Sequence, residues 1–286
     1  MLIGAIEAGG TKFVCAVGDE HGKIVEKTSF PTGAPEETLA LAKQFFANFN
    51  IKALGVGMFG PVNLDRKSAK YGTVLNTPKI KWRHYPILEK LKKDYEIPVY
   101  LDTDVNAACL GEYHYGAGKH VDSCLYMTVG TGIGAGFVLR GEVFQGRTHP
   151  EMGHILMKQH PNDSFAGSCP SHGSCLEGLA SGTAMEKRYG MKADLLAEHN
   201  YIWEIEAYYL AQALMNYYVI LSPEKMILGG GVMKQVKLYT MIRKQFMKLL
   251  NDYMEVEHVD ELIVAPELED EQGVKGAIAL AVKQDL

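Results

Sequence analysis

The sequence predicts an α/β protein built from two similar halves. A strand–glycine turn–strand pattern occurs twice, at Leu2–Val17 and at Leu125–Arg140, and segments with helical periodicity follow each copy. The 286 residues suffice for one large or two moderate domains, and 47% hydrophobic residues is ordinary globular composition. Chance similarity between two short hairpins is the alternative explanation of this repeat.

The first half is predicted to begin as a β-meander. Three strands separated by glycine-containing turns are expected, at Leu2–Ala8, Phe13–Val17 and Lys23–Ser29. The periodicity then predicts a helix, a buried strand, a helix, a short strand and a helix, at Pro35–Phe49, Ala53–Met58, Pro86–Tyr95, Pro98–Leu101 and Thr103–Tyr115.

The second half repeats the meander and then becomes mainly helical. Its strands are expected at Leu125–Val129, Gly136–Arg140 and from Glu142 onward, before a loop-rich insert from Phe144 to Ser174. Helices are predicted at Leu176–Tyr189, Ile202–Leu221, Met233–Asn251 and Val274–Val282, and strands at Lys225–Leu228 and Glu261–Ala265.

Charge and cysteine content exclude several classes of protein. The balance of 29 basic against 34 acidic residues, a net charge of −5, argues against a general nucleic-acid binder or a basic membrane-surface protein. No basic region precedes the apolar N-terminus and no uncharged stretch suits a transmembrane helix, so a soluble, cytoplasmic protein is expected. The 5 cysteines then argue against a disulfide framework, and Cys15, Cys109 and Cys124 are expected to be buried thiols.

Three glycine-rich turns follow predicted strands. They are Gly9-Gly10-Thr11-Lys12, Gly130-Thr131-Gly132 and Gly229-Gly230-Gly231. Backbone N–H groups in such turns can approach an anion closely, and threonine adds a hydroxyl donor. One such turn commonly only closes a hairpin, whereas three favour a nucleotide phosphate site. Neither hairpin turn opens into a helix, so the Walker and Rossmann patterns do not apply.

Two aspartates, Asp102 and Asp104, lie where a strand ends and a helix begins. An aspartate at this place can cap the helix or stabilise its dipole. It can also accept a proton from a substrate hydroxyl during phosphoryl transfer. The local sequence favours neither role over the other.

The insert contains the sharpest pattern in the chain. Four residues with nitrogen or sulfur ligands are grouped there, the number a structural zinc takes: His154, Cys169, His172 and Cys175. Two free thiols and two surface histidines are the alternative. Glu151 and Glu177 flank this group, where a metal would hold them rigidly for hydrogen bonds to a polyol; two solvated surface glutamates are the ordinary alternative.

With these motifs in place, the chain resembles the ROK family of sugar kinases and repressors, in the hexokinase–actin ATPase superfamily. The resemblance lies in the three glycine turns, in Glu151-Met152-Gly153-His154 and in the run from Cys169 to Glu177. It implies two ribonuclease H-like lobes, the actin-like ATPase fold, with a cleft between them and a zinc-bearing insert. The lobes would be residues 1–116, joined by the C-terminal helix 272–284, and residues 117–271, with the zinc-binding insert at 144–175.

The zinc run and Asp102-Thr103-Asp104-Val105-Asn106 are more similar to the fructokinase branch than to the glucokinase branch. This likeness implies phosphorylation of D-fructose to D-fructose 6-phosphate by in-line transfer from ATP, with Mg²⁺ and Zn²⁺, in a homodimer. A hexokinase preferring mannose or glucose is the main alternative. A sugar-sensing repressor is disfavoured because no helix-turn-helix precedes the first strand, and a zinc hydrolase because four protein ligands close the metal.

The resemblance also assigns roles to residues. Asp104 would be the catalytic base. The hexose would contact Gly60, Pro61, Asp104, Glu151, His154 and Glu177. The phosphates would contact Gly9, Gly10, Thr11, Lys12, Thr131 and Gly132, and the adenosine Gly229, Gly230 and Gly231. The first motif opens with Glu7, where the family usually has an aspartate near the magnesium.

Overall fold

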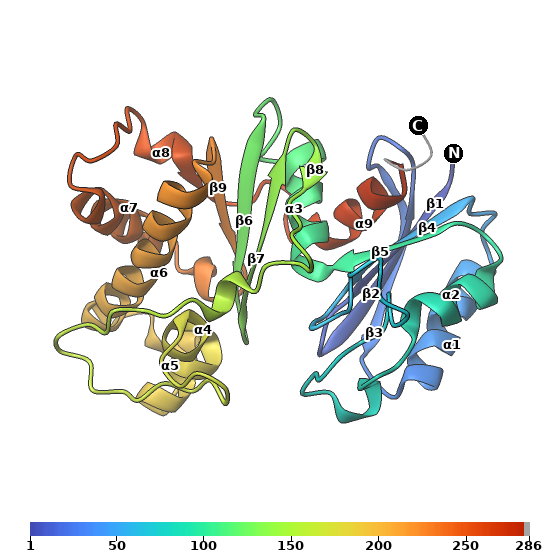
Figure 1. Cartoon of the computed structure of the whole chain (residues 1–286), viewed down its shortest axis with the longest axis horizontal. Helices are drawn as coiled ribbons and strands as arrows, with labels where there is room; N and C mark the ends of the chain where they lie inside the picture. The colour runs from blue at the N-terminus through green and yellow to red at the C-terminus, as the bar shows by residue number, and fades with distance from the viewer. Residues whose placement is uncertain (283–286) are drawn as a thin grey trace. The chain divides into compact units, whose positions relative to one another are not determined.

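The computed structural model describes residues 1 to 282, which form two compact units (Figure 1). The first unit comprises Met1–His120, Gly136–Pro150 and the described residues from Glu267; the second comprises Val121–Ala135 and Glu151–Pro266. The predicted last helix is α9, Gln272–Val282, and positions 283 and 284 lie outside the described residues. Over residues 1 to 282, no helix combines the length and apolar character needed to cross a bilayer.

The first sheet confirms the predicted meander. Its strands are β1 (Ile3–Ala8), β2 (Lys12–Gly18), β3 (Ile24–Pro31), β4 (Ala53–Met58) and β5 (Val99–Thr103), in the order β3-β2-β1-β4-β5. Strands β1 to β3 pair antiparallel, whereas β1, β4 and β5 run parallel because helical connections intervene. Those connections contain α1 (Pro35–Phe46), the short 3-10 helix η1 (Ile80–Trp82) and α2 (Ile87–Tyr95); α3 (Asp104–Tyr115) follows β5.

Both faces of this sheet are covered. Alternate residues of β1 point to opposite faces, so Ile6 and Ala8 join the core beneath α1 and α2, while Ile3 and Ala5 pack against α9 (Figure 1). Helix α9 lies so close to α3 that a Cβ on Gly276 would come within 1.6 Å of the Ala107 carbonyl oxygen. Only glycine permits this approach, which fixes the position of α3 and of the residues at its N-terminus.

The second sheet has the same internal order as the first. Its strands β6 (Ser123–Val129), β7 (Ile133–Leu139), β8 (Glu142–Val143), β9 (Lys225–Gly229) and β10 (Ile263–Val264) lie in the order β10-β9-β6-β7-β8. In both sheets the first strand lies at the centre, with the second and third on one side and the fourth and fifth on the other. A shared order of five strands confirms the repeat predicted from two short hairpins.

The helices of the second half are α4 (Leu176–Ala180), α5 (Gly182–Tyr189), α6 (Asn200–Leu221), α7 (Lys237–Leu250) and α8 (Val259–Leu262), with short 3-10 helices η2 (Met152–His154), η3 (Ala193–Leu196) and η4 (Val232–Lys234). The prediction of one helix over Leu176–Tyr189 is wrong. Ser181 adopts extended backbone and its side chain caps α5 by accepting a hydrogen bond from the Ala184 N–H. The capping serine therefore divides the segment into two short helices.

Other boundaries also differ from prediction: the first helix ends at Phe46 and not at Phe49, and β7 spans Ile133–Leu139 where Gly136–Arg140 was expected. The helix expected from Met233 begins only at Lys237, because η4 occupies the residues directly after the third glycine turn. The strand expected at Glu261–Ala265 is reduced to Ile263–Val264, since the residues before it form α8, whose first turn contains Asp260 and Glu261. Acidic side chains there favour a helix start through the helix dipole. Cys15, Cys109 and Cys124 are fully buried, as expected.

Candidate active site

At the N-terminus of α3 the cap is made by a threonine and by neither aspartate, while Asp104 lies in the first turn, where it can still stabilise the helix dipole. Thr103 is the N-cap residue, and its side-chain oxygen accepts a hydrogen bond of 3.2 Å from the Asn106 N–H. Asp102 instead accepts bonds from the Thr103 N–H at 2.7 Å and from the Asn106 side chain at 2.6 Å. Asp104 is therefore not the N-cap but the first residue of α3, and its carboxylate accepts a bond of 2.9 Å from the Val105 N–H.

Two carboxyl groups on this sheet, those of Glu7 and Asp102, have raised pKa values. Burial raises the pKa of Glu7, on β1, to about 7; the negative charge of Asp104 raises it further, and Lys12 opposes the shift. Burial also raises the pKa of Asp102, against hydrogen bonds from Asn106 and Thr103 that lower it. Glu7 is therefore partly protonated near neutral pH, which lessens its repulsion of the Asp104 charge.

The first glycine turn is open to solvent at its tip. The Gly9 N–H donates to the Lys12 carbonyl at 3.0 Å, which closes the hairpin, while Thr11 and Lys12 are exposed. From the end of β3, Thr32 donates its N–H to the Thr11 carbonyl at 2.9 Å and its hydroxyl to the Gly9 carbonyl at 2.7 Å. The turn is thus held through its carbonyls and leaves the exposed side for a ligand.

The second and third glycine turns lie in the second unit. A Cβ on Gly132 would come within 2.6 Å of a Glu177 carboxylate oxygen, and the N–H of Ile133, which follows it, donates to that oxygen at 3.0 Å. In the third turn Gly230 has a φ of +94°, a conformation that favours glycine, and any side chain there would also meet the Val129 backbone. Glycine is therefore favoured at positions 132 and 230, because any side chain there would come too close to neighbouring atoms.

The four predicted metal ligands converge in the second unit. The ligand atoms of His154, Cys169, His172 and Cys175 all lie within 4.8 Å of one another. The Nδ1 atom of His154 is 3.8 Å from the Cys169 sulfur and 3.5 Å from the Cys175 sulfur, and Nδ1 of His172 is 3.7 Å from Cys169. Nitrogen and sulfur atoms on a tetrahedral zinc lie about 3.6 Å apart, so these separations fit the ion.

The Cys175 thiol needs a metal to ionise at neutral pH. Burial raises the pKa of the Cys175 thiol to about 11, so without a cation it stays protonated at neutral pH. Cys175 is also the N-cap residue of α4. A bound zinc would replace the proton, and the sulfur would then fix the start of that helix.

The two glutamates beside the cluster differ in their surroundings. Glu177, in the first turn of α4, has one carboxylate oxygen 3.9 Å from His154 Nε2, the ring nitrogen that does not face the sulfurs. Glu151 precedes η2 and is exposed to solvent. Its backbone carbonyl accepts a hydrogen bond of 3.0 Å from the His154 N–H. His154 thus presents Nδ1 to the metal cluster and Nε2 to the side where a hydroxyl ligand is expected.

The insert has a second anchor that the sequence did not reveal. Arg188 of α5 pairs with Asp163 at 3.1 Å, and both side chains are less than a tenth exposed, at 7% and 4%. Tyr209 of α6 donates its hydroxyl to the same carboxylate at 2.6 Å, and the guanidinium lies 4.8 Å from the Phe165 ring centre. This buried ion pair therefore holds the insert in addition to any metal bound at the cluster. No local pattern predicts the ion pair, since its partners come from separate elements.

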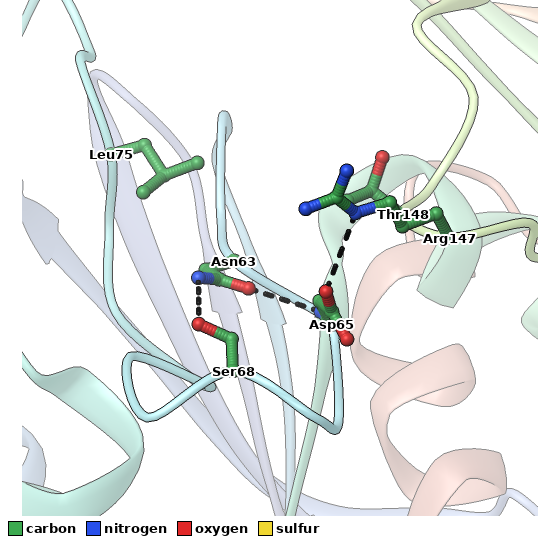
Figure 2. Close-up of a pocket in the computed structure, with 6 residues that line it drawn as sticks. All are labelled: Asn63, Asp65, Ser68, Leu75, Arg147 and Thr148. Atoms are coloured by element: carbon green, nitrogen blue, oxygen red, sulfur yellow. Dashed lines mark hydrogen bonds and ion pairs between the residues drawn. The ribbon is translucent and has the colours of Figure 1, made fainter.

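A pocket of about 330 Å³ in the first unit was also missed (Figure 2). It is lined by Asn63, Asp65, Ser68, Leu75, Arg147 and Thr148, and Arg147 Nε lies 3.5 Å from an Asp65 oxygen. Leu75 also donates its N–H to the carbonyl of Pro61, whose bond to Gly60 is cis, so the pocket adjoins the loop expected to contact the sugar. Amide, hydroxyl and paired charged groups are suited to binding a polyol.

The strand order of the two sheets defines the actin-like ATPase fold, and the comparisons with known proteins agree. A model of the ROK family matches residues 3–284. The chain belongs to the ROK family. A fructokinase of Pediococcus pentosaceus is 44% identical over 98% of both chains, and a fructokinase of Streptococcus mutans is 44% identical over 99% of this chain and 98% of that one.

A solved structure extends the comparison. A ROK family glucokinase from Streptomyces griseus, crystallised in complex with glucose and AMPPNP, is 27% identical and superposes with a TM-score of 0.80, covering 99% of this chain and 100% of the other. The likeness therefore spans the whole fold and is not limited to the motifs.

Proposed function

We propose that this chain is a fructokinase that transfers the terminal phosphoryl group of ATP to D-fructose, forming D-fructose 6-phosphate. The observation that carries the proposal is the 44% identity, over nearly the full length, with two proteins named fructokinase. The start of α3 supports it, because the N-cap is Thr103 and the helix start therefore does not require Asp104 as its cap.

In this mechanism Asp104 is the base. The sugar hydroxyl oxygen bonds to the γ-phosphorus while the bond from that phosphorus to the β,γ-bridging oxygen breaks, and the hydroxyl proton passes to the Asp104 carboxylate. Glu7 helps Asp104 to stay ionised. With a pKa of about 7, Glu7 is partly protonated near neutral pH, so it repels a charged Asp104 less than a fully ionised carboxylate would. Magnesium bound with ATP would neutralise charge on the phosphates.

The remaining expected contacts belong to the same proposal. Gly9, Gly10, Thr11, Lys12, Thr131 and Gly132 bind the phosphates, Gly229 to Gly231 bind the adenosine, and Gly60, Pro61, Glu151, His154 and Glu177 bind the hexose. His154, Cys169, His172 and Cys175 would hold a structural zinc, which orients Glu177 and His154 and takes no part in the transfer. The family resemblance supports a cytoplasmic homodimer, which light scattering after gel filtration tests.

A coupled ATP assay across fructose, mannose and glucose tests the substrate. We expect kcat/KM to be highest for fructose. A higher kcat/KM for mannose or glucose than for fructose would instead indicate a hexokinase that prefers that sugar. Absence of turnover with all three sugars, in protein that contains zinc and binds ATP, would reject the kinase assignment itself.

A further inference from the structure

A lysine far from the glycine motifs lies beside the first glycine turn. The Cε atom of Lys79 lies 4.0 Å from the point that a Cβ on Gly10 would occupy. Within the described chain, and apart from the residues adjoining Gly10, no other heavy atom comes within 4 Å of that point. Lys79 therefore borders an open space directly over the turn.

Buried contacts fix this placement. Trp82, three residues after Lys79, is 1% exposed, and its ring packs against that of Phe13 on β2 with centroids 5.5 Å apart. The indole N–H donates to the Gly33 carbonyl at 2.9 Å. Gly33 follows Thr32, whose two hydrogen bonds hold the first glycine turn. The turn and the Lys79 segment are thus tied to the same short stretch of chain.

The backbone at Lys79 is also constrained. Its carbonyl accepts the Trp82 N–H at 2.8 Å in the start of η1, and its own N–H donates to the buried Thr77 hydroxyl at 3.4 Å. An exposed lysine is ordinarily a freely moving, solvated side chain. Here the main chain that carries it is held by the buried Trp82 and by Thr77, so the side chain of Lys79 starts from a fixed point beside the turn.

Two exposed lysines lie at the turn, and the acidic group near Lys12 is Glu7, whose pKa of about 7 leaves it partly protonated. Lys12 and Lys79 are both exposed, and no hydrogen bond or ion pair with another part of residues 1 to 282 engages either ammonium group. Two cations beside a glycine turn with accessible backbone favour an anion between them. Phosphate oxygens are the acceptors that such a pair of lysines binds most readily.

We propose that Lys79 is a catalytic residue that binds the phosphoryl group being transferred, opposite Lys12 across the first glycine turn. This inference rests on the proposed kinase function. Lys79 keeps its protons throughout: the sugar oxygen bonds to phosphorus, the bond to the bridging oxygen breaks, the proton goes to Asp104, and the ammonium stabilises the charge on the phosphoryl oxygens.

The test compares Lys79→Met, which keeps the length of the side chain but removes its charge, with Lys79→Arg and with Lys81→Met. Lys81 is an exposed lysine of the same short helix and serves as the matched control. A charge-assisted hydrogen bond is worth about 1.5–3 kcal/mol, so we expect Lys79→Met to lower kcat/KM for ATP about 10–150-fold. Lys79→Arg should recover part of this loss, and Lys81→Met should change kcat/KM less than twofold.

Binding without turnover separates this inference from the assignment of the enzyme. Calorimetry with ATP–Mg²⁺ and with ADP–Mg²⁺, in the absence of sugar, should show a larger loss of affinity for ATP in Lys79→Met, with fructose affinity and Tm unchanged. Unaltered ATP binding and kcat, or equal losses for ATP and ADP, would overturn the role on the transferred group. If fructose is not a substrate but ATP affinity still depends on Lys79, the phosphate contact stands and the substrate assignment fails.

Discussion

The first and second glycine turns occupy the same place in the repeated hairpin but have different surroundings. The first, from Gly9 to Lys12, is held through its carbonyls by Thr32 and has an exposed tip beside two lysines. The second, from Gly130 to Gly132, is tied to the segment from α4 to α5. Gly182 donates its N–H to the Gly130 carbonyl at 2.7 Å, and Thr183 donates its hydroxyl to the Thr131 carbonyl at 2.7 Å.

This difference shows how one hairpin pattern was adapted twice. The first turn depends only on strands, a threonine and a buried tryptophan, so its shape does not require a metal. The second turn depends on α4, whose N-cap residue is the metal ligand Cys175 and whose first turn contains Glu177. We therefore expect changes at the first sheet to alter the chemical step, and changes at the metal cluster to alter hexose binding through His154 and Glu177.

The largest effect is expected from Asp104→Asn at the first sheet. The amide keeps the size of the side chain and leaves the Thr103 cap intact but cannot accept the proton, so kcat should fall about 10²–10⁴-fold. Fructose affinity and Tm should change little. A variant that retains more than about a tenth of the original kcat would assign Asp104 a role in stabilising the helix start instead.

Breaking the metal cluster should affect the second unit, where it should weaken hexose binding. Cys169→Ser, or removal of zinc by a chelator, should weaken fructose binding about 10–100-fold and ATP binding much less, because Glu177 and His154 lose their fixed positions. Calorimetry on metal-loaded and chelated protein measures both. Ser171→Ala in the same loop supplies no ligand and is the control. Equal losses of both affinities would indicate global unfolding, and no loss would mean that the cluster does not shape the sugar site.

Glu7 gives a pH test of the first sheet. Folding raises its pKa from 4.5 to about 7, so the folded state holds the proton more tightly than the unfolded chain. This contribution to stability is complete below about pH 4.5, is lost as the pH rises through about 7, and amounts to roughly 3 kcal/mol. Urea unfolding of the nucleotide-free protein from pH 5 to 8 should show the decline, and Glu7→Gln should reduce it. An identical slope in that variant would contradict the raised pKa.

The smallest effect is expected at the link between α5 and the second turn. Thr183→Val removes the hydroxyl that donates to the Thr131 carbonyl, a bond worth about 0.5–1.5 kcal/mol. We expect ATP affinity to fall about 2–10-fold, with Thr183→Ser retaining it. If Thr183→Val binds ATP as the original protein does, the second turn does not need α5 for its shape.

Much of this architecture could be predicted from local patterns. The alternation of β1 and the glycine turns predict the meander, and Thr103 and Asp104 mark the helix start. The zinc ligands could be predicted because three of them lie within seven residues of the chain. The break at Ser181 could not, because its cap competes with an uninterrupted helical pattern and only packing decides between them.

The sequence by itself determined the order of strands and helices, the repeated hairpin and the chemical groups available for phosphate, proton and metal. Each of these depends on interactions between residues close in the chain, which short-range periodicity and spacing record. Only the tertiary structure decided that Arg188 holds Asp163, that Glu177 reaches the backbone of Ile133 and that Lys79 lies over Gly10. These contacts join separate elements, and their partners are set by how buried side chains such as Trp82 pack, which no local pattern encodes.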